Sequence, residues 1–343
     1  MAYTNIDLPT DYFNTTAYTG NGSAGRNLTT GTFQPDWVWI KSRSDTDDHR
    51  LVDAVRGATI HFESNNIAQE QTSSNVTAFT STGITLSSNG AVNANAETYV
   101  VWSWLGANTT VSNTQGTRTS TVSANTTSGF SIVSYTGNST AGATIGHGLG
   151  VKPSMIITKQ RSGDVAEPAV YHTSTGATKF FKLNTTDAVI TNSTLWNDTE
   201  PTSTLFTVGT AALTNASHPI IAYCFAEVKG YSKFGSYTGN GSADGTFVYT
   251  GFKPAFVLTK SSSNTSPWLI YDNKRLGYNA GNNYFYANST NVEASDAPFD
   301  VLSNGFKFRN TFTDGNGSGY TYIYMAFAEN PFVSSKGIPT TAR

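Results

Sequence analysis

This 343-residue chain has little cysteine, little charge and no long apolar run. Its single cysteine, Cys224, excludes an intrachain disulfide framework, so each hydrophobic core must be stable without cross-links. Charged residues make up only 13% of the chain, and the net charge of −2 provides no field to hold a polyanion, so we expect no nucleic-acid partner. No segment approaches the ~20 apolar residues of a membrane span, and residues 1–6 lack the basic start of a secretion signal. We therefore expect a chain made in a cytoplasm, without membrane insertion.

The composition that replaces the missing charge favours strands and turns. Thr, Ser, Asn and Gly are abundant, together with 17 Tyr and 20 Phe. Thr, Tyr, Phe, Val and Ile suit a half-buried pleated surface, while Gly and Asn supply the positive φ angles of tight turns. Hardly any stretch shows the 3.6-residue apolar period of a stable helix. The sequence therefore predicts an all-β fold.

One sequence pattern occurs three times. Each copy begins with Tyr-Thr-Gly-Asn and continues through a proline and an apolar run to a lysine, with tyrosine-to-lysine separations of 23, 24 and 23 residues. The copies begin at Tyr18, Tyr135 and Tyr237, and the lysines are Lys41, Lys159 and Lys260. Each copy also closes with an aromatic, apolar strand. Such constant spacing predicts three tandem copies of a domain of about 100 residues.

The pattern also predicts the domain boundaries. They are an N-terminal arm at 1–12, a first repeat at 13–108, a linker or hairpin plus a second repeat at 109–230, a third repeat at 231–332 and a C-terminal tail at 333–343. Short strands between frequent turns indicate β-sandwiches of jelly-roll or lectin-like type. The stretches 117–124 and 130–135 flank a turn-like sequence and predict a hairpin that opens the second repeat.

The apolar run after each proline predicts a central strand. Residues 37–40 are apolar on both strand faces, as expected for a strand buried between two layers. Lys41, Lys159 and Lys260 stand at the ends of these runs. We expect their aliphatic stems to cover the core while the ammonium groups reach water.

The candidate chemical motifs favour structural interpretations. Residues 20–25 match G-x-G-x-x-G, but a strand-like sequence follows where a phosphate-binding loop needs a helix, so we predict a shared turn. Asp53, His172 and Asp272 occupy matching positions, and their changing identity indicates a locally hydrogen-bonded strand-end residue, not a catalytic base. We expect Cys224 to be a buried, inert thiol. The sequence thus predicts no catalytic residues and no cofactor.

Two acidic loops and one aromatic group are possible ligand sites. The loops at 45–48 and 314–319 offer calcium-type oxygens but lack a full ligand set, so a solvated turn is the favoured alternative and no metal site is predicted. Aromatic rings that could stack on sugars occur in the middle of the third repeat, although such rings are more often core. These candidate ligand-binding residues are Trp268, Tyr271, Tyr284 and Tyr286.

Several longer stretches resemble a family of virion-associated proteins of tailed phages that infect marine bacteria. They are DYFNT (11–15), YTGNG (18–22), FQPDWVWIK (33–41), HRLVDAVRGA (49–58), GFSIVSYTG (129–137), GHGLG (146–150) and NPFVSSKG (330–337). The resemblance spans nearly the whole chain. It implies a structural or tail-associated protein that is located in the virion, is assembled in the host cytoplasm and contacts other virion proteins, and it brings no catalytic residues.

Together these observations predict a non-enzymatic virion surface protein. We expect a tail-fibre, tail-tip or head-appendage component that makes weak multivalent contacts with host surface glycans, because repetition raises avidity without a strong single site. A capsid decoration protein is the structural alternative, favoured by the polar N-terminal arm. A polysaccharide depolymerase is the enzymatic alternative and requires a converging carboxylate pair. By analogy with other fibre-like parts, we expect a homo-oligomer, namely a trimer.

Overall fold

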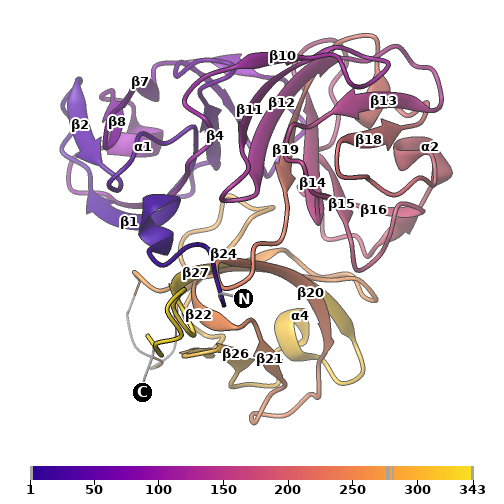
Figure 1. Cartoon of the computed structure of the whole chain (residues 1–343). Helices are drawn as coiled ribbons and strands as arrows, with labels where there is room; N and C mark the ends of the chain where they lie inside the picture. Colours follow the sequence, from indigo (N-terminus) through magenta and orange to yellow (C-terminus); the bar gives the residue numbers. More distant parts are fainter. Residues whose placement is uncertain (1–2, 276–278, 280–281, 341–343) are drawn as a thin grey trace.

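The computed structural model describes residues 3–275, 279 and 282–340 and consists mostly of β-strands (Figure 1). We refer to residues 13–108, 109–230 and 231–332 as segments 1, 2 and 3. Each segment contains one large and one small antiparallel sheet. The prediction of an all-β fold is confirmed. Within the described residues, no helix has the length and apolarity to cross a membrane.

Segment 1 contains the large sheet β1-β9-β3-β4-β5-β6 and the small sheet β2-β8-β7. A 3-10 turn, η1, precedes it at Pro9–Asp11. The elements are β1 Phe13–Thr19, β2 Arg26–Thr29, β3 Trp37–Ser42, β4 Arg50–Asp53, β5 Ile60–Phe62, β6 Gln71–Thr72, β7 Val76–Thr80, β8 Gly83–Leu86, α1 Gly90–Asn93 and β9 Thr98–Trp104.

Segment 2 contains the large sheet β10-β11-β12-β19-β14-β15-β16-β17 and the small sheet β13-β18. Its elements are β10 Val111–Asn113, β11 Ser120–Asn125, β12 Phe130–Thr136, β13 Ala143–Gly146, β14 Met155–Gln160, β15 Ala169–His172, β16 Lys179–Lys182, β17 Ile190–Thr191, α2 Ser193–Trp196, β18 Leu205–Val208, α3 Ala212–Asn215 and β19 Pro219–Phe225. Strands β11 and β12 pair as an antiparallel hairpin, which confirms the predicted opening of this segment.

Segment 3 contains the large sheet β20-β27-β22-β23-β24 and the small sheet β21-β26-β25. Its elements are β20 Ser232–Thr238, β21 Phe247–Tyr249, β22 Phe252–Ser261, β23 Leu269–Asp272, β24 Tyr284–Tyr286, β25 Phe299–Leu302, β26 Gly305–Phe308, α4 Thr313–Asn316 and β27 Thr321–Pro331. In all three segments the opening strand pairs with the closing strand, which pairs in turn with the post-proline strand.

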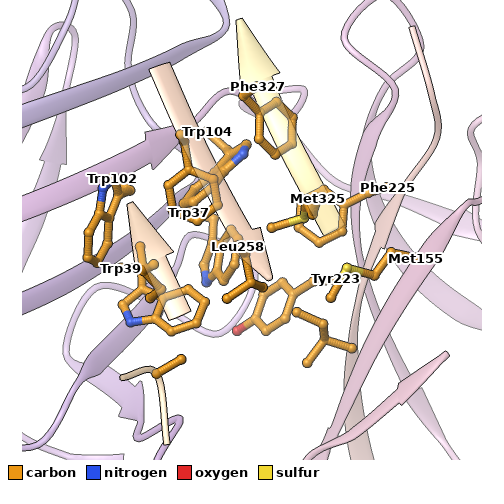
Figure 2. Packing of buried hydrophobic residues seen from close by; sticks show 14 of the residues in the cluster. Trp37, Trp39, Trp102, Trp104, Met155, Tyr223, Phe225, Leu258, Met325 and Phe327 are labelled. Carbon is orange, nitrogen blue, oxygen red and sulfur yellow. The ribbon is translucent and has the colours of Figure 1, made fainter. Parts of the chain in front are cut away.

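The large sheets are buried on both faces because each separates two cores. In β3, Val38 and Ile40 face a core private to segment 1, whereas Trp37 and Trp39 face a core that all three segments share. Figure 2 shows this shared core, where side chains of the three large sheets meet. Its members include Trp37, Trp39, Trp102, Trp104, Met155, Tyr223, Phe225, Leu258, Met325 and Phe327. The three segments therefore pack around one shared core. The strand 37–40 is apolar on both faces because one face lies in this core and the other in the core of its own segment.

The N-terminal arm is docked on the rest of the chain. Ile6 is buried in the shared core, and the Tyr3 hydroxyl donates to the carbonyl of Gly251 in segment 3 at 2.7 Å. The Asp7 carboxylate accepts the backbone N–H of Ser335 at 2.6 Å. An apolar side chain therefore anchors the predicted polar arm, and the described residues near both termini lie beside segment 3.

Candidate functional site

The Tyr-Thr-Gly-Asn motif is a turn that a buried asparagine holds in each segment. The amide oxygens of Asn93, Asn215 and Asn316 accept the backbone N–H of the motif asparagine at 3.1, 2.9 and 3.1 Å. Their amide nitrogens donate to carbonyls of two nearby loops. Sequence reasoning missed these residues, although an asparagine four or five positions before each closing strand was the available signal.

The motif tyrosine and glycine complete this turn. Tyr18 donates its hydroxyl to the Val92 carbonyl at 2.8 Å, and Tyr135 and Tyr237 do the same in their segments. A Cβ on Gly20 would lie 2.0 Å from the Ala94 carbonyl oxygen, so the position requires glycine. Strand β2 follows, not a helix. The prediction of a structural turn is confirmed.

The three repeat lysines are buried, which corrects the expectation that they reach water. Lys41, Lys159 and Lys260 are at most 3% exposed, and each ammonium group donates to backbone carbonyls. The Lys159 ammonium reaches the Asn66 carbonyl of segment 1, and that of Lys260 reaches the Thr186 carbonyl of segment 2. Burial lowers the pKa of each lysine to about 8. Carbonyl dipoles from adjoining loops replace the water that a strand-end lysine would otherwise have.

The matching residues Asp53, His172 and Asp272 form hydrogen bonds between segments. Asp53 accepts the Tyr223 hydroxyl of segment 2 at 2.8 Å, and Asp272 accepts the Trp102 indole N–H of segment 1 at 3.0 Å. His172 lies 3.1 Å from the Tyr324 carbonyl of segment 3 through Nε2. The three contacts close a ring in which every segment touches both others. The predicted local hydrogen bonds are also present, from the backbone of the following turn.

Whether this position holds an aspartate (Asp53, Asp272) or a histidine (His172) follows from the side chain that it faces in the neighbouring segment. Tyr223, Trp102 and Met325 occupy the same place on the closing strands, opposite Ile157, Trp39 and Leu258. Tyrosine and tryptophan donate to a carboxylate. Methionine has no donor, so the third junction uses a histidine that reaches the adjacent carbonyl. Burial lowers the His172 pKa to about 4, so the ring is neutral near pH 7. These groups join the segments.

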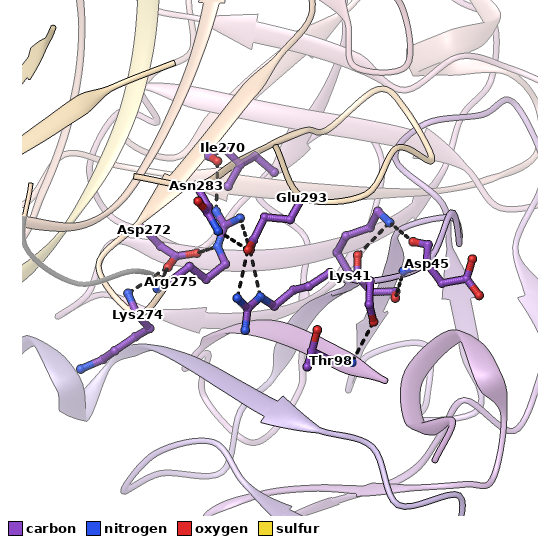
Figure 3. Close-up of polar contacts among 12 residues, drawn as sticks. Lys41, Asp45, Thr98, Ile270, Asp272, Lys274, Arg275, Asn283 and Glu293 are labelled. Carbon is purple, nitrogen blue, oxygen red and sulfur yellow. Dashed lines mark hydrogen bonds and ion pairs between the residues drawn. The ribbon is translucent and has the colours of Figure 1, made fainter. Parts of the chain in front are cut away.

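A second ring of contacts joins the strand ends. The backbone N–H groups of Glu293, Glu70 and Val189 donate to the carbonyls of Arg43, Arg161 and Ser262 at 3.1, 3.2 and 3.2 Å. Two of these junctions add an arginine–carboxylate pair, Arg43–Glu293 at 2.9 Å and Arg161–Glu70 at 2.7 Å. Figure 3 shows Glu293 reaching the buried Arg275, which also pairs with Asp272. The guanidinium groups of Arg43 and Arg275 lower the pKa of Glu293.

The predicted ligand-binding aromatics lie mostly inside the protein. Trp268, Tyr271 and Tyr284 are at most 1% exposed, and only Tyr286 is half-buried. The Trp268 indole donates to the Lys182 carbonyl of segment 2, and Tyr271 stacks on Phe299 at 4.2 Å. Three of the four rings therefore offer no face to a sugar, because the two cores use them.

The other predicted candidates are also placed. Cys224 is fully buried, and burial raises the pKa of its thiol, as expected for an inert cysteine. In the 45–48 loop, the Asp45 carbonyl accepts from Lys41 and the Asp48 carboxylate accepts from Asn65. The 314–319 stretch overlaps α4 and contains Asn316, the buried asparagine that holds the turn of segment 3. Among the described residues, no three His, Cys, Asp or Glu side chains gather to hold a metal.

One cavity lies between segments 1 and 2, beside the turn that follows β4, and another lies in segment 3, beside the turn that follows β23. The first, of about 260 Å³, lies between Asp36, Val55, Asn108, Thr109 and Ser123, among others. Burial raises the Asp36 pKa to about 6, although the N–H groups of Gly106 and Asn108 bond its carboxylate. The other, of about 100 Å³, is lined by Lys253, Lys274, Glu329 and three asparagines. Each described lining supplies one carboxylate, whereas glycoside hydrolysis uses two.

The model of one protein family, described as "Domain of unknown function (DUF7483)", matches residues 8–331. The match begins before segment 1 and ends at the last residue of β27, so the family unit is the complete ring of three segments. No curated protein and no solved structure matches the chain.

Proposed function

The chain belongs to the DUF7483 family, and we propose that it is a non-enzymatic structural protein of a phage virion surface, in a tail fibre, tail tip or head appendage. The observation that carries the proposal is the shared core, which fixes three β segments as one block. A block of this kind suits a particle component that must keep its shape while exposing several loops. The virion setting rests on the family resemblance of the sequence motifs.

The use of the buried polar groups supports a scaffold function. Hydrogen bonds between segments and loops engage all of these groups, namely Asp53, Asp272, His172 and the three repeat lysines. An active site would instead direct such groups into a cavity. A capsid decoration protein stays the structural alternative, although Ile6 anchors the N-terminal arm within the same chain.

Labelling of phage particles tests this function. Antibodies raised against the purified chain are applied to intact virions of the phage that encodes it, and the gold label is located by electron microscopy. We expect label on the tail or on a head appendage. Uniform label over the head shell supports the decoration alternative, and a chain absent from purified virions contradicts the proposal. Release of reducing sugar from host envelope would establish the depolymerase alternative.

A further inference from the structure

The outer face of the small sheet in segment 3 differs from its counterparts in segments 1 and 2 at three of four compared positions, and the fourth, Gly305, is also a glycine in segment 1. Strands β21 and β26 pair Phe247 with Lys307 and Tyr249 with Gly305. The same pairs are Asn27–Thr85 and Thr29–Gly83 in segment 1, and Thr144–Thr207 and Gly146–Leu205 in segment 2. Segment 3 alone carries two aromatic side chains and a lysine where the others carry mostly hydroxyl, amide or glycine residues.

The two aromatic side chains are exposed to solvent and do not pack into the core of segment 3. Phe247 is 43% and Tyr249 49% exposed, whereas Val248 between them is buried in the segment 3 core. The Phe247 ring leans over Gly305: a Cβ added there would lie 2.9 Å from the ring. Tyr249 continues the row towards the N-terminal arm, where its hydroxyl lies 3.3 Å from that of Tyr3. Phe247 and Tyr249 therefore lie on the same, outward face of β21, on either side of the buried Val248.

Charged side chains border this surface, and their charges cancel. Lys307 pairs with Asp244 at 2.6 Å, and Arg309 pairs with Asp244 at 3.2 Å and with Asp300 at 3.3 Å. Asp244 stands where segments 1 and 2 have Gly25 and Gly142, seven residues after the motif tyrosine. Its side chain is 79% exposed. Two cations and two carboxylates therefore present both donors and acceptors beside the rings.

We propose that this surface, formed by Phe247, Tyr249, Lys307, Asp244, Arg309 and Asp300, binds a neutral sugar ring of a glycan. The C–H face of a hexopyranose is apolar and packs flat on an aromatic ring, and its hydroxyl groups can bond to both signs of charge at the border. The balanced charge favours a neutral over an anionic glycan. The inference rests on the proposed function and gives the host-glycan contact a place.

The size of the surface argues against a protein occupant. Two half-exposed rings offer roughly 200 Å², well below the ≈ 800 Å² that each partner buries in a stable interface. The strand edge beside them is only three residues long, which limits pairing with a strand from another chain. A sugar ring needs no more area than the rings provide.

The test compares matched substitutions in segments 3 and 1. Phe247→Asn and Tyr249→Thr install the residues that segment 1 carries at those positions, and Asn27→Ala and Thr29→Ala are the controls. Each full-length variant is applied to a glycan array printed with neutral and anionic oligosaccharides. Thermal denaturation confirms that each variant is folded.

We expect wild type to bind neutral glycans, both segment 3 variants to lose at least tenfold in apparent affinity, and the controls to bind as wild type does. Binding that is restricted to anionic glycans, is unaffected by Phe247→Asn and Tyr249→Thr, or is absent from the array overturns the inference. Capture of a second protein chain by this face would do the same. Virion labelling is independent of the array, so the structural function can hold when glycan binding fails.

Discussion

At the residue scale, the three repeat lysines are buried although most charged residues of the chain are not. Lys41, Lys159 and Lys260 end apolar strands, a position that favours exposure of the ammonium group, yet all three are enclosed. The strand pattern predicts that they follow an apolar run, but their burial depends on loops of neighbouring segments that supply carbonyl oxygens. Those loops are 93 and 74 residues away for Lys159 and Lys260. Local sequence therefore could not show the enclosure.

The buried lysines predict a stability that rises with pH just above neutrality. Their pKa is about 8 in the folded protein and 10.5 ordinarily, so between these values the unfolded state binds more protons. The free energy of unfolding should increase as pH rises from 8 to 9, by about 1 kcal/mol per unit for each lysine. Urea denaturation at pH 7.5, 8, 8.5 and 9 measures it.

The variant Lys159→Met should remove about a third of this slope, whereas the half-exposed Lys152→Met should leave it unchanged. The window ends near pH 9 because burial raises the pKa of Cys224 above its ordinary value of 9. Above that pH, ionisation of the unfolded thiol opposes the lysines. A stability that is flat or falling between pH 8 and 9 would show that the lysines are not enclosed in solution.

At the element scale, the strands follow the sequence closely because their signals are local. The opening strands, the post-proline strands and the closing strands all lie where alternation and turn residues place them, as does the β11–β12 hairpin. The candidate aromatics show the limit of such signals. Trp268 lies just before β23 and Tyr271 lies within it, three residues later. Trp268 belongs to the shared core and Tyr271 to the core private to segment 3, so only the presence of two cores explains why both are enclosed.

Tyr223 on β19 tests the polar ring between segments. Its hydroxyl donates to Asp53 at 2.8 Å and lies 3.1 Å from the Arg56 guanidinium, with all three side chains buried. Tyr223→Phe keeps the ring packing but removes a hydrogen bond to a charged group, so it should lower the free energy of unfolding by about 1.5–3 kcal/mol. Urea denaturation measures the loss.

Tyr12→Phe is the matched control, because the Tyr12 hydroxyl forms no hydrogen bond with any residue that the structure describes. It should change stability by less than ~0.5 kcal/mol. Equal effects from the two substitutions would mean that the Asp53 contact contributes nothing to the joining of segments 1 and 2.

At the scale of the whole molecule, the three segments depend on one another. The sequence predicts three domains in series, and the large sheets of the three segments have a strand order in common. In a series of independent domains, each domain has only its own core. Here one cluster also joins side chains from all three segments, among them Phe13, Trp104, Phe225, Phe256 and Phe327. The sequence predicts that Trp37 and Trp39 are buried. It does not show that side chains of other segments, such as Tyr223 against Trp37, help to bury them.

The shared core predicts that the chain unfolds in a single cooperative step. Differential scanning calorimetry should show one transition whose calorimetric and van't Hoff enthalpies agree, despite a length at which separate domains often melt apart. Trp104→Ala removes a ring at the meeting point of the segments and should destabilise that transition by about 3–5 kcal/mol without splitting it. Trp196→Ala, in the private core of segment 2, should also shift the same single transition. Two or three resolved transitions in the wild type would contradict the shared core. A segment that unfolds alone would expose shared-core side chains to water while the other segments stay folded; in segment 1 these are Trp37, Trp39, Trp102 and Trp104.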